Sequence, residues 1–305
     1  MTRDLMLAEE PLQDPDLTPG APVTRTNWQL FRRRFFRHKL ALVSIAVLGI
    51  LMIACFGAPW LAPYKQGAQN ILQSSEGPST KHWFGTDDLG RDQLSEIMYA
   101  GRISLTIGLV VAFLSTIVGV TVGAVAAYSG KATDEGLSAL TDLFLILPDL
   151  ALLAVALLYL GQGFTSIILV LALLSWMYVA RIVRAQVLSL KEKEFVEAAR
   201  ASGASTTRIL VRHLVPNCIG SIMVNASLAV AAAVSTEAAL SFLGFGVQPP
   251  QNSWGRMLSD AEAYTTSTSK FYLVFFPGFM LLLTVLAVNF LGDALRDAFD
   301  PQSRH

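Results

Sequence analysis

The chain has 305 residues, of which 53% are hydrophobic and 15% are charged, and its mean hydropathy is +0.49. About a quarter of the residues in a water-soluble globular protein are charged, so this composition excludes a soluble globule and predicts a membrane protein. Lys and Arg together number 23, as do Asp and Glu. This balance excludes a nucleic-acid-binding protein held by bulk positive charge.

The first 39 residues are predicted to precede the membrane. Residues 1–27 contain four prolines and five acidic residues, and they have too little apolar content to form a packed core, which predicts a disordered tail. Between positions 27 and 39, aromatic side chains alternate with arginines, as in a short amphipathic helix at the level of the lipid headgroups. A basic anchor with no further role explains the same pattern.

Six apolar runs without Lys or Arg are long enough to cross a bilayer. A hydrocarbon core about 30 Å thick needs about 20 residues at about 1.5 Å each. The runs are 40–60, 103–128, 143–160, 164–180, 219–242 and 271–291. The third and fourth are short and are joined by a glycine-containing turn at 161–163. The predicted fold is therefore an all-α polytopic membrane protein whose transmembrane domain covers 40–291.

The basic residues set the predicted orientation. With the N-terminus in the cytoplasm, 17 Lys and Arg residues fall on the inner side and six on the outer side. Cytoplasmic segments of membrane proteins are enriched in Lys and Arg, so both termini are predicted to be cytoplasmic. This orientation gives outer loops at 61–102 and 243–270, an inner loop at 181–218 and a cytoplasmic tail at 292–305.

The residues needed for catalysis, metal binding or nucleotide binding are not grouped in the sequence. Cys55 and Cys218 lie far apart, and the four histidines show no spacing typical of metal ligands. Gly130-Lys131 is followed by Ala132 and lacks the leading glycine of a phosphate-binding loop. The sequence therefore predicts no catalytic residue, no metal site and no cofactor bound by this chain.

Two acidic residues fall inside the apolar runs, Asp149 in the third and Glu237 in the fifth. A charged side chain facing lipid is costly, so each is expected to face protein or water, and one interpretation is a position lining a substrate path. The alternative is structural. Asp149 follows Pro148 and would then lie near a helix end, while Glu237 would lie in water close to the outer surface.

The second run carries a small residue at every fourth position, including Gly119 and Gly123. Small residues at this spacing allow two helix backbones to approach closely. The pattern is equally consistent with helix packing inside this chain and with a contact between subunits, so the motif alone leaves both possibilities open.

The loop between the fourth and fifth runs is the most informative segment. Residues 191–200 are strong helix formers, and Phe195, Ala198, Ala199 and Ser202 fall on one narrow face. Gly203 interrupts the pattern, and Ser205 is placed to cap a second helix over 206–214. Two short helices bent at a glycine can transmit a push to the spans on both sides. A solvated loop with one charged helix is the alternative.

This loop resembles the EAA signature of permease subunits of bacterial ATP-binding-cassette importers. The resemblance is carried by Glu197-Ala198-Ala199, by Gly203, and by Pro216 at the end of a hydrophobic segment. His213 and Val215 depart from the general form, and RHLVPN at 212–217 is similar to the peptide and nickel branch of this family.

Two further segments are similar to the C-type permease of dipeptide and oligopeptide importers. They are FGTDDLGRD at 84–92, which contains Arg91 and Asp92, and SFLGFGVQPP at 241–250, which leads to Trp254. Glu96 stands where this branch often has Arg. A weak internal similarity relates residues 89–95, which contain LGR and LS, to residues 254–259, which contain WGR and LS, and this suggests a pair of gate helices at the outer mouth of a pore.

The resemblance implies a type I importer permease fold and a machine of five parts in the bacterial cytoplasmic membrane. This chain would pair with a second permease, two ATPases and an external substrate-binding protein. The ATPases would bind ATP and Mg²⁺, and Glu197, Ala198, Ala199 and Gly203 would form a coupling helix docked in one of them. Candidate residues of the substrate path or outer gate are Glu237, Asp149, Arg91, Asp92 and Trp254.

Peptides are the expected substrate class, by the resemblance. Importers of nickel complexes, glutathione and other small solutes share this scaffold, so these solutes remain alternative substrates. A channel without ATPase partners would leave the EAA loop without a function. A polytopic membrane enzyme, such as an intramembrane protease, would need clustered polar residues, and only Asp149 and Glu237 lie inside the apolar runs.

Overall fold

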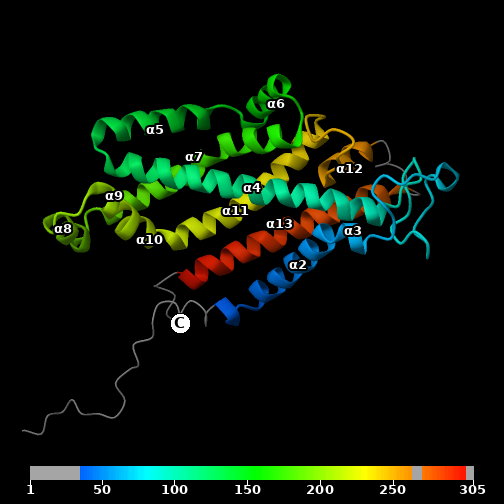
Figure 1. Cartoon of the computed structure of the whole chain (residues 1–305), viewed down its shortest axis with the longest axis horizontal. Coiled ribbons are helices and arrows are strands. Elements are labelled where there is room, and N and C mark those ends of the chain that lie inside the picture. Colours follow the sequence, from blue (N-terminus) through cyan, green and yellow to red (C-terminus); the bar gives the residue numbers. More distant parts are fainter. Residues whose placement is uncertain (1–34, 263–269, 300–305) are drawn as a thin grey trace, which may run out of the picture.

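The computed structural model describes residues 35–262 and 270–299, and the regular structure in these ranges is helical apart from one isolated bridge between Thr86 and Asp92. Five helices are long and apolar enough to cross a membrane, and they run side by side along the long axis of the molecule (Figure 1). These are α2 (Lys39–Phe56), α4 (Gln93–Tyr128), α7 (Phe164–Leu190), α11 (Ile219–Phe242) and α13 (Tyr272–Phe299).

Shorter helices fill the segments between the long ones. They are α3 (Ala58–Leu61), η1 (Ile71–Gln73), α5 (Lys131–Ile146), α6 (Asp149–Leu160), α8 (Glu194–Ala201), α9 (Thr206–Ile209), η2 (Leu210–Leu214), α10 (Val215–Asn217) and α12 (Trp254–Asp260). Helices α8 and α9 lie at one end of the molecule, and α3 and the loop after it lie at the other (Figure 1).

The third predicted span is broken. Helices α5 and α6 are bent by 91° relative to each other, and together they make a broken span or a re-entrant loop. Leu147 is extended because it precedes Pro148, whose ring disfavours helical geometry in the residue before it. The prediction of one helix over 143–160 is therefore wrong, and α5 already begins at Lys131. The chain has up to six spans when the bent pair counts as one.

Other predicted boundaries also shift, because helices continue past the apolar runs. Helix α4 begins at Gln93, α7 continues to Leu190 and α13 continues to Phe299. A helix needs only its hydrogen bonds and a cap, so polar residues extend it beyond the membrane. Residues 93–102 of the predicted outer segment are therefore helical, and the predicted tail that begins at 292 is helical up to Phe299. The predicted tail 1–27 lies outside the described residues.

Helix α4 occupies the centre of the bundle and packs along α7. A side chain at Gly119 or Gly123 would collide with α7, near the main chain of Trp176 and Ala180 respectively. The small-residue pattern therefore serves packing inside this chain, because it lets the two backbones approach. A cluster of buried apolar side chains from α4, α6, α7 and α11 fills the adjacent interior, and it includes Ile107, Leu157, Ile167, Leu171 and Leu240.

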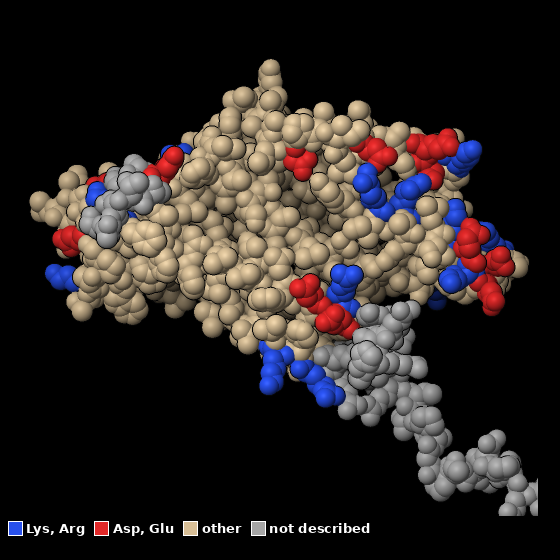
Figure 2. Space-filling model, turned by 180° about the vertical axis from the view of Figure 1, so that it is seen from behind, with Lys and Arg blue, Asp and Glu red and all other residues tan. Residues whose placement is uncertain are grey.

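One face of the molecule has a broad region with few Lys, Arg, Asp or Glu side chains (Figure 2). Seen from behind, Lys, Arg, Asp and Glu gather mainly toward the two ends and along one lower edge, and uncharged side chains cover the space between them (Figure 2). Many large apolar side chains of the long helices and of α6 are exposed, among them Ile50, Phe113, Leu158 and Leu173. An extensive apolar surface of this kind fits a lipid environment or a partner subunit.

Candidate functional site

The loop 191–218 is a compact unit attached to the bundle by apolar packing. Val196 of α8 is fully buried, and its cluster includes Val187 of α7 and Ile209 and Leu214 from the second half of the loop. Fully burying a side chain of this size contributes about 1.5–3 kcal/mol. Val196 therefore fixes α8 on the end of α7. No feature of the sequence distinguishes Val196, although it lies in the stretch 191–200 that is predicted to be helical.

Most residues of the EAA signature are open to solvent rather than packed on the bundle. Glu197, Ala198 and Gly203 are exposed, and Ala199 is partly buried. The predicted narrow face is therefore divided, because Ala199 packs toward the bundle while Phe195 and Ala198 are exposed. A knob with a small, exposed tip is a shape that fits into a cleft of another protein.

Gly203 ends α8 with a left-handed turn. Its φ is +76°, its N–H donates to the Arg200 carbonyl, and the N–H of Ala204 donates to the Ala199 carbonyl. Glycine is favoured in this conformation because it has no Cβ to clash with the following carbonyl group. The Gly203 turn therefore reverses the chain directly after α8.

The second half of the loop matches its predicted cap but not its predicted helix. The hydroxyl of Ser205 accepts a hydrogen bond from the N–H of Arg208, as expected for an N-cap. The single helix predicted over 206–214 is instead a short α-helix, α9, followed by a π-helical turn, η2. A π-turn is wider than an α-turn, and here it rotates Leu214 into the same buried cluster as Val196.

Two polar contacts tie this loop to α4. The guanidinium of Arg200 lies 5.3 Å from the ring centre of Tyr128, and its Nε donates to the Tyr128 hydroxyl over 3.2 Å. The ammonium group of Lys191 donates to the carbonyl of Ala127 over 3.2 Å, at the C-terminal end of α4, where a cation is favourable. Both partners of α4 lie more than 60 positions away in sequence, so no local pattern indicates them.

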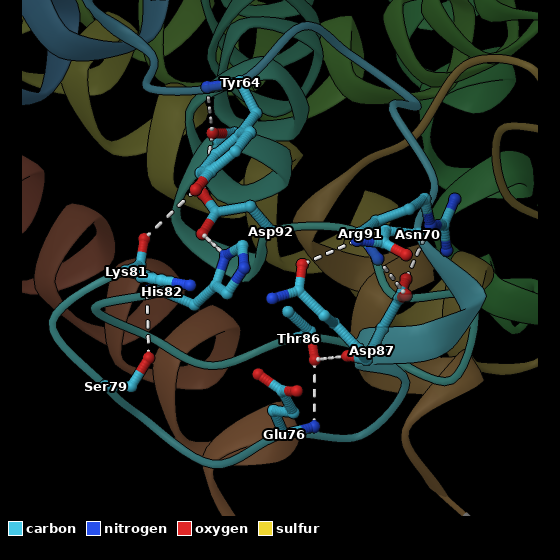
Figure 3. A network of polar contacts seen from close by, with 12 residues as sticks. Tyr64, Asn70, Glu76, Ser79, Lys81, His82, Thr86, Asp87, Arg91 and Asp92 are labelled. Atoms are coloured by element: carbon cyan, nitrogen blue, oxygen red, sulfur yellow. Dashed lines mark hydrogen bonds and ion pairs between the residues drawn. The ribbon is translucent and has the colours of Figure 1, made fainter.

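At the other end of the molecule, the loop 62–92 is organised by a polar network (Figure 3). The imidazole Nδ1 of His82 lies 2.9 Å from a carboxylate oxygen of Asp92, and both side chains are buried. The second Asp92 oxygen accepts from the N–H and hydroxyl of Ser95 and so caps α4. Tyr64 stacks on the His82 ring at 5.0 Å. Asp92, a candidate gate residue, therefore starts α4.

Arg91 and Asp87 close a tight turn in the same loop. The Nε of Arg91 donates to Asp87 over 2.5 Å, and the same carboxylate accepts from the N–H groups of Leu89 and Arg91. Neighbouring Asp88 is affected by two opposing influences. Burial raises its pKa, but hydrogen bonds from Ser75 and Lys270 lower it further, so the pKa of Asp88 lies below its usual value.

Glu237 belongs to a buried hydrogen-bond group between α11 and α12. Its Oε1 accepts from the hydroxyl of Ser241 over 2.6 Å and from that of Ser253 over 2.7 Å. The residue is 0% exposed, and its Oε2 has no partner within the described part of the chain. The alternative that Glu237 lies in water is therefore wrong, because the side chain is enclosed by protein. Its contacts join two helices.

Trp254 lies directly beside this group and is fully buried. Its indole N–H donates to the carbonyl of Ile97 over 2.9 Å, and its backbone N–H donates to the hydroxyl of Ser104 over 3.1 Å. A Cβ at Gly101 would collide with the Trp254 ring and with the sulfur of Cys55. The structure thus brings Glu237 and Trp254 together, where they hold α12 on α4 and α11.

The segments 87–96 and 252–261, which contain the two weakly similar stretches 89–95 and 254–259, meet across one hollow. It has a volume of about 90 Å³ and is lined by Asp87, Arg91 and Glu96 from one segment and by Asn252 and Asp260 from the other. Arg91 therefore faces the same space as the residues flanking Trp254.

Asp149 stands apart from these residues. It is exposed at the first position of α6, and one of its oxygens lies 3.4 Å from the hydroxyl of Tyr178 on α7. The expectation that it follows a proline at a helix end is confirmed. Across residues 35–262 and 270–299, no group of three or more His, Cys, Asp or Glu side chains is placed to hold a metal ion.

Comparison with known proteins gives two family matches that together cover most of the chain. Residues 119–305 match the family described as binding-protein-dependent transport system inner membrane component. Residues 26–78 match the family described as the N-terminal transmembrane domain of oligopeptide transport permease C.

Individual relatives are similar over nearly their whole length. The oligopeptide transport system permease protein OppC of Bacillus subtilis is 39% identical over 91% of this chain and 90% of its own. The dipeptide transport system permease protein DppC of the same organism is 38% identical over 94% and 88%. The OppC protein of Haemophilus influenzae is 39% identical over 92% and 90%.

Among solved structures, the inward-facing methionine transporter MetNI contains a chain with the same fold. The TM-score is 0.55 at 20% sequence identity, and the match covers 67% of this chain and 96% of that one. The chain therefore belongs to the family of binding-protein-dependent inner-membrane transport components, as a multi-pass permease subunit of an ABC importer in the branch of the oligopeptide and dipeptide permeases.

Proposed function

We propose that this chain is the C-type subunit of an ATP-driven importer that carries di- or oligopeptides across a bacterial cytoplasmic membrane by alternating access. Its relatives bear the names of oligopeptide and dipeptide permeases, which supports this substrate class. The complete importer would contain a second permease, two ATPases that bind ATP and Mg²⁺, and an external binding protein. Nickel complexes and glutathione remain the alternative cargo.

The single observation that carries the coupling role is the geometry of α8. Val196 fixes this helix to the end of α7, Arg200 attaches it to Tyr128 of α4, and Glu197 and Ala198 remain open to a partner. A push on the exposed face would therefore reach two long helices at once. In the proposed function this face docks on an ATPase, with both termini of the chain in the same compartment as α8.

Closure of the two ATPases around ATP would then shift the spans between two packings, one open on each side of the membrane. No covalent chemistry is needed in this chain, because the nucleotide is hydrolysed in the partners. Differential binding of ATP to the two states would supply the free energy. Peptide would pass from the binding protein into a space between the two permeases.

The coupling role is tested with Glu197→Arg and Gly203→Leu in the complete transporter reconstituted in vesicles. We expect uptake of labelled peptide to fall in both variants, with loss of ATP hydrolysis stimulated by the loaded binding protein, while each variant still inserts. Glu135→Arg on α5 makes the same charge change at another exposed position and should leave both rates unchanged. Normal uptake in both loop variants would remove the coupling role.

The substrate class is tested separately, by deleting this subunit in cells and following uptake of labelled dipeptides, oligopeptides, nickel and glutathione. Loss of peptide uptake alone supports the proposal. Loss of nickel or glutathione uptake with normal peptide uptake would replace peptide by that solute and would leave the importer function intact.

A further inference from the structure

Helix α5 is attached to the bundle in an unusual way. Of its residues only Thr141 is buried, although α5 is the first half of the broken span. Near its C-terminal end, Phe144 and Leu145 are partly buried against Trp176 and Met177 of α7, which gives an apolar contact at that level. This packing leaves the N-terminal half of α5 to be held in another way.

Two ion pairs join α5 to α7, one in the N-terminal half of α5 at Asp134 and one in its C-terminal half at Asp142. Arg184 binds Asp134 through two parallel hydrogen bonds, from Nε over 2.5 Å and from a terminal nitrogen over 2.7 Å. Three residues earlier on α7, Arg181 binds Asp142 over 2.5 Å. The Arg184 and Asp134 side chains are 33% and 20% exposed, whereas those of Arg181 and Asp142 are more than half exposed. The Arg184 pair is therefore the better shielded of the two.

Between these attachments, α5 stands away from the bundle. A hollow of about 260 Å³ lies between α4, α5 and α7, and it is lined by small residues such as Gly123, Ala126 and Ala180. Arg181, Arg184 and Asp142 form part of the same wall. Because space rather than apolar packing separates the helices here, the two arginines bridge the gap between α7 and α5.

The position of these arginines connects them to the loop 191–218. Helix α7 ends at Leu190, and α8 begins at Glu194, so Arg184 lies less than two turns before the point where α8 is attached. The N-terminal end of α5 lies at the same end of the molecule as α8 and α9 (Figure 1). By contrast, the contacts of the loop through Lys191 and Arg200 reach α4.

We propose that Arg184 with Asp134, assisted by Arg181 with Asp142, forms a strut that moves α5 and α6 together with α7 when α8 is pushed. The proposal rests on the proposed coupling role of α8. A planar guanidinium bound through two parallel hydrogen bonds resists sliding between the helices, and this suits it to transmit a displacement. Asp134 and Arg184 are thus positioning residues that act through α5 and α6.

The test compares Arg184→Asp, Asp134→Arg and the double swap in the reconstituted transporter. The measured quantity is the number of substrate molecules imported per ATP hydrolysed, together with the amount of assembled complex. Each single variant places like charges opposite each other, and we expect the ratio to fall by about tenfold or more while the complex remains assembled. The double swap restores an opposite pair and should recover most of the ratio.

Lys131→Glu is the matched control. Lys131 pairs with Glu135 on the same helix, both side chains are largely exposed, and the contact stays within α5. The control should keep the wild-type ratio. Equal ratios in wild type and both single variants would overturn the strut, as would a double swap that assembles fully but keeps the low ratio. If Arg184→Asp does not assemble, Arg184→Lys, which keeps the charge and loses the parallel bonds, takes its place.

A distance measurement separates the strut from the identity of the cargo. Spin labels at the exposed positions Ala139 on α5 and Ser189 on α7 report the spacing of the two helices, since the native Cys55 and Cys218 are buried. We expect the spacing to stay constant between the nucleotide-free and ATP-bound complex in wild type and to change in Arg184→Asp. A spacing that changes with ATP in the wild type would refute the strut. This result does not depend on whether the imported solute is a peptide.

Discussion

The hydroxyl of Ser253 donates a hydrogen bond to Oε1 of Glu237 over 2.7 Å, and this bond joins the start of α12 to the C-terminal part of α11. Ser253 also caps α12 by accepting from the N–H of Arg256. One serine therefore both begins a short helix and holds it on α11. Because both side chains are buried, water cannot take the place of the carboxylate as acceptor when Glu237 is removed.

Replacement of Glu237 by Ala should lower the stability of the permease. The change leaves the hydroxyls of Ser241 and Ser253 without their acceptor in a dry site, and such unpaired groups cost about 1–3 kcal/mol each. Glu237→Gln keeps an acceptor oxygen and should lie between wild type and Glu237→Ala. Thermal unfolding of the detergent-purified complex measures the difference, and equal melting temperatures for Ala and wild type would contradict this assignment.

The close approach at Gly101 predicts a strong effect of a single methyl group. In Gly101→Ala the new Cβ would press on the Trp254 ring and the Cys55 sulfur, and overpacking of this kind costs about 1–3 kcal/mol. Gly49 on α2 is the matched control, because a Cβ added there would meet no atom within 4 Å. Gly49→Ala therefore gains helix propensity without a clash. Unfolding temperatures should fall for the first variant and stay level or rise for the second.

Asp92 is expected to control the order of the loop 62–92. Asp92→Ala removes the cap of α4 and the partner of His82 together, and loss of a cap alone costs about 0.5–2 kcal/mol. Faster cleavage of this loop by an added protease, followed on vesicles or purified complex, is the expected result.

Asp88→Ala is the control for this prediction. The pair of Asp88 with Lys270 is partly exposed, and exposed ion pairs contribute only about 0–1 kcal/mol. Cleavage of Asp88→Ala should therefore stay close to the wild-type rate. If both variants were cleaved at the same rate, Asp92 would have no special part in ordering the loop.

The left-handed turn at Gly203 predicts an order among substitutions. The φ of +76° is tolerated by Asn but is strained for Val, and a non-glycine residue in this region costs roughly 1–2 kcal/mol. A Cβ at Gly203 would meet no atom, so strain rather than a clash decides the effect. Gly203→Asn should retain more transport than Gly203→Val in vesicle uptake assays. The reverse order would show that side-chain size at the tip matters more than backbone conformation.

The sequence by itself determined where the chain can cross a membrane, because the apolarity of a run is a local property. It also indicated the loop with Glu197 and Gly203, since a short helix, a glycine and a serine cap are neighbours in the chain. It failed at 143–160, where apolar residues continue on both sides of Pro148. A hydropathy profile does not reveal a bend, whereas a proline does indicate one, because it disfavours helical geometry in the residue before it.

Tertiary structure alone decided which polar groups meet. Asp134 and Arg184 are 50 positions apart, and Trp254 bonds a carbonyl 157 positions away, so no spacing rule reveals either contact. Val196 and Glu197 are neighbours in sequence, yet one is fully buried and the other exposed, because the packing of α8 against α7 and η2 selects the face. Such contacts arise from the three-dimensional approach of whole helices, which depends on the packing of many side chains at once.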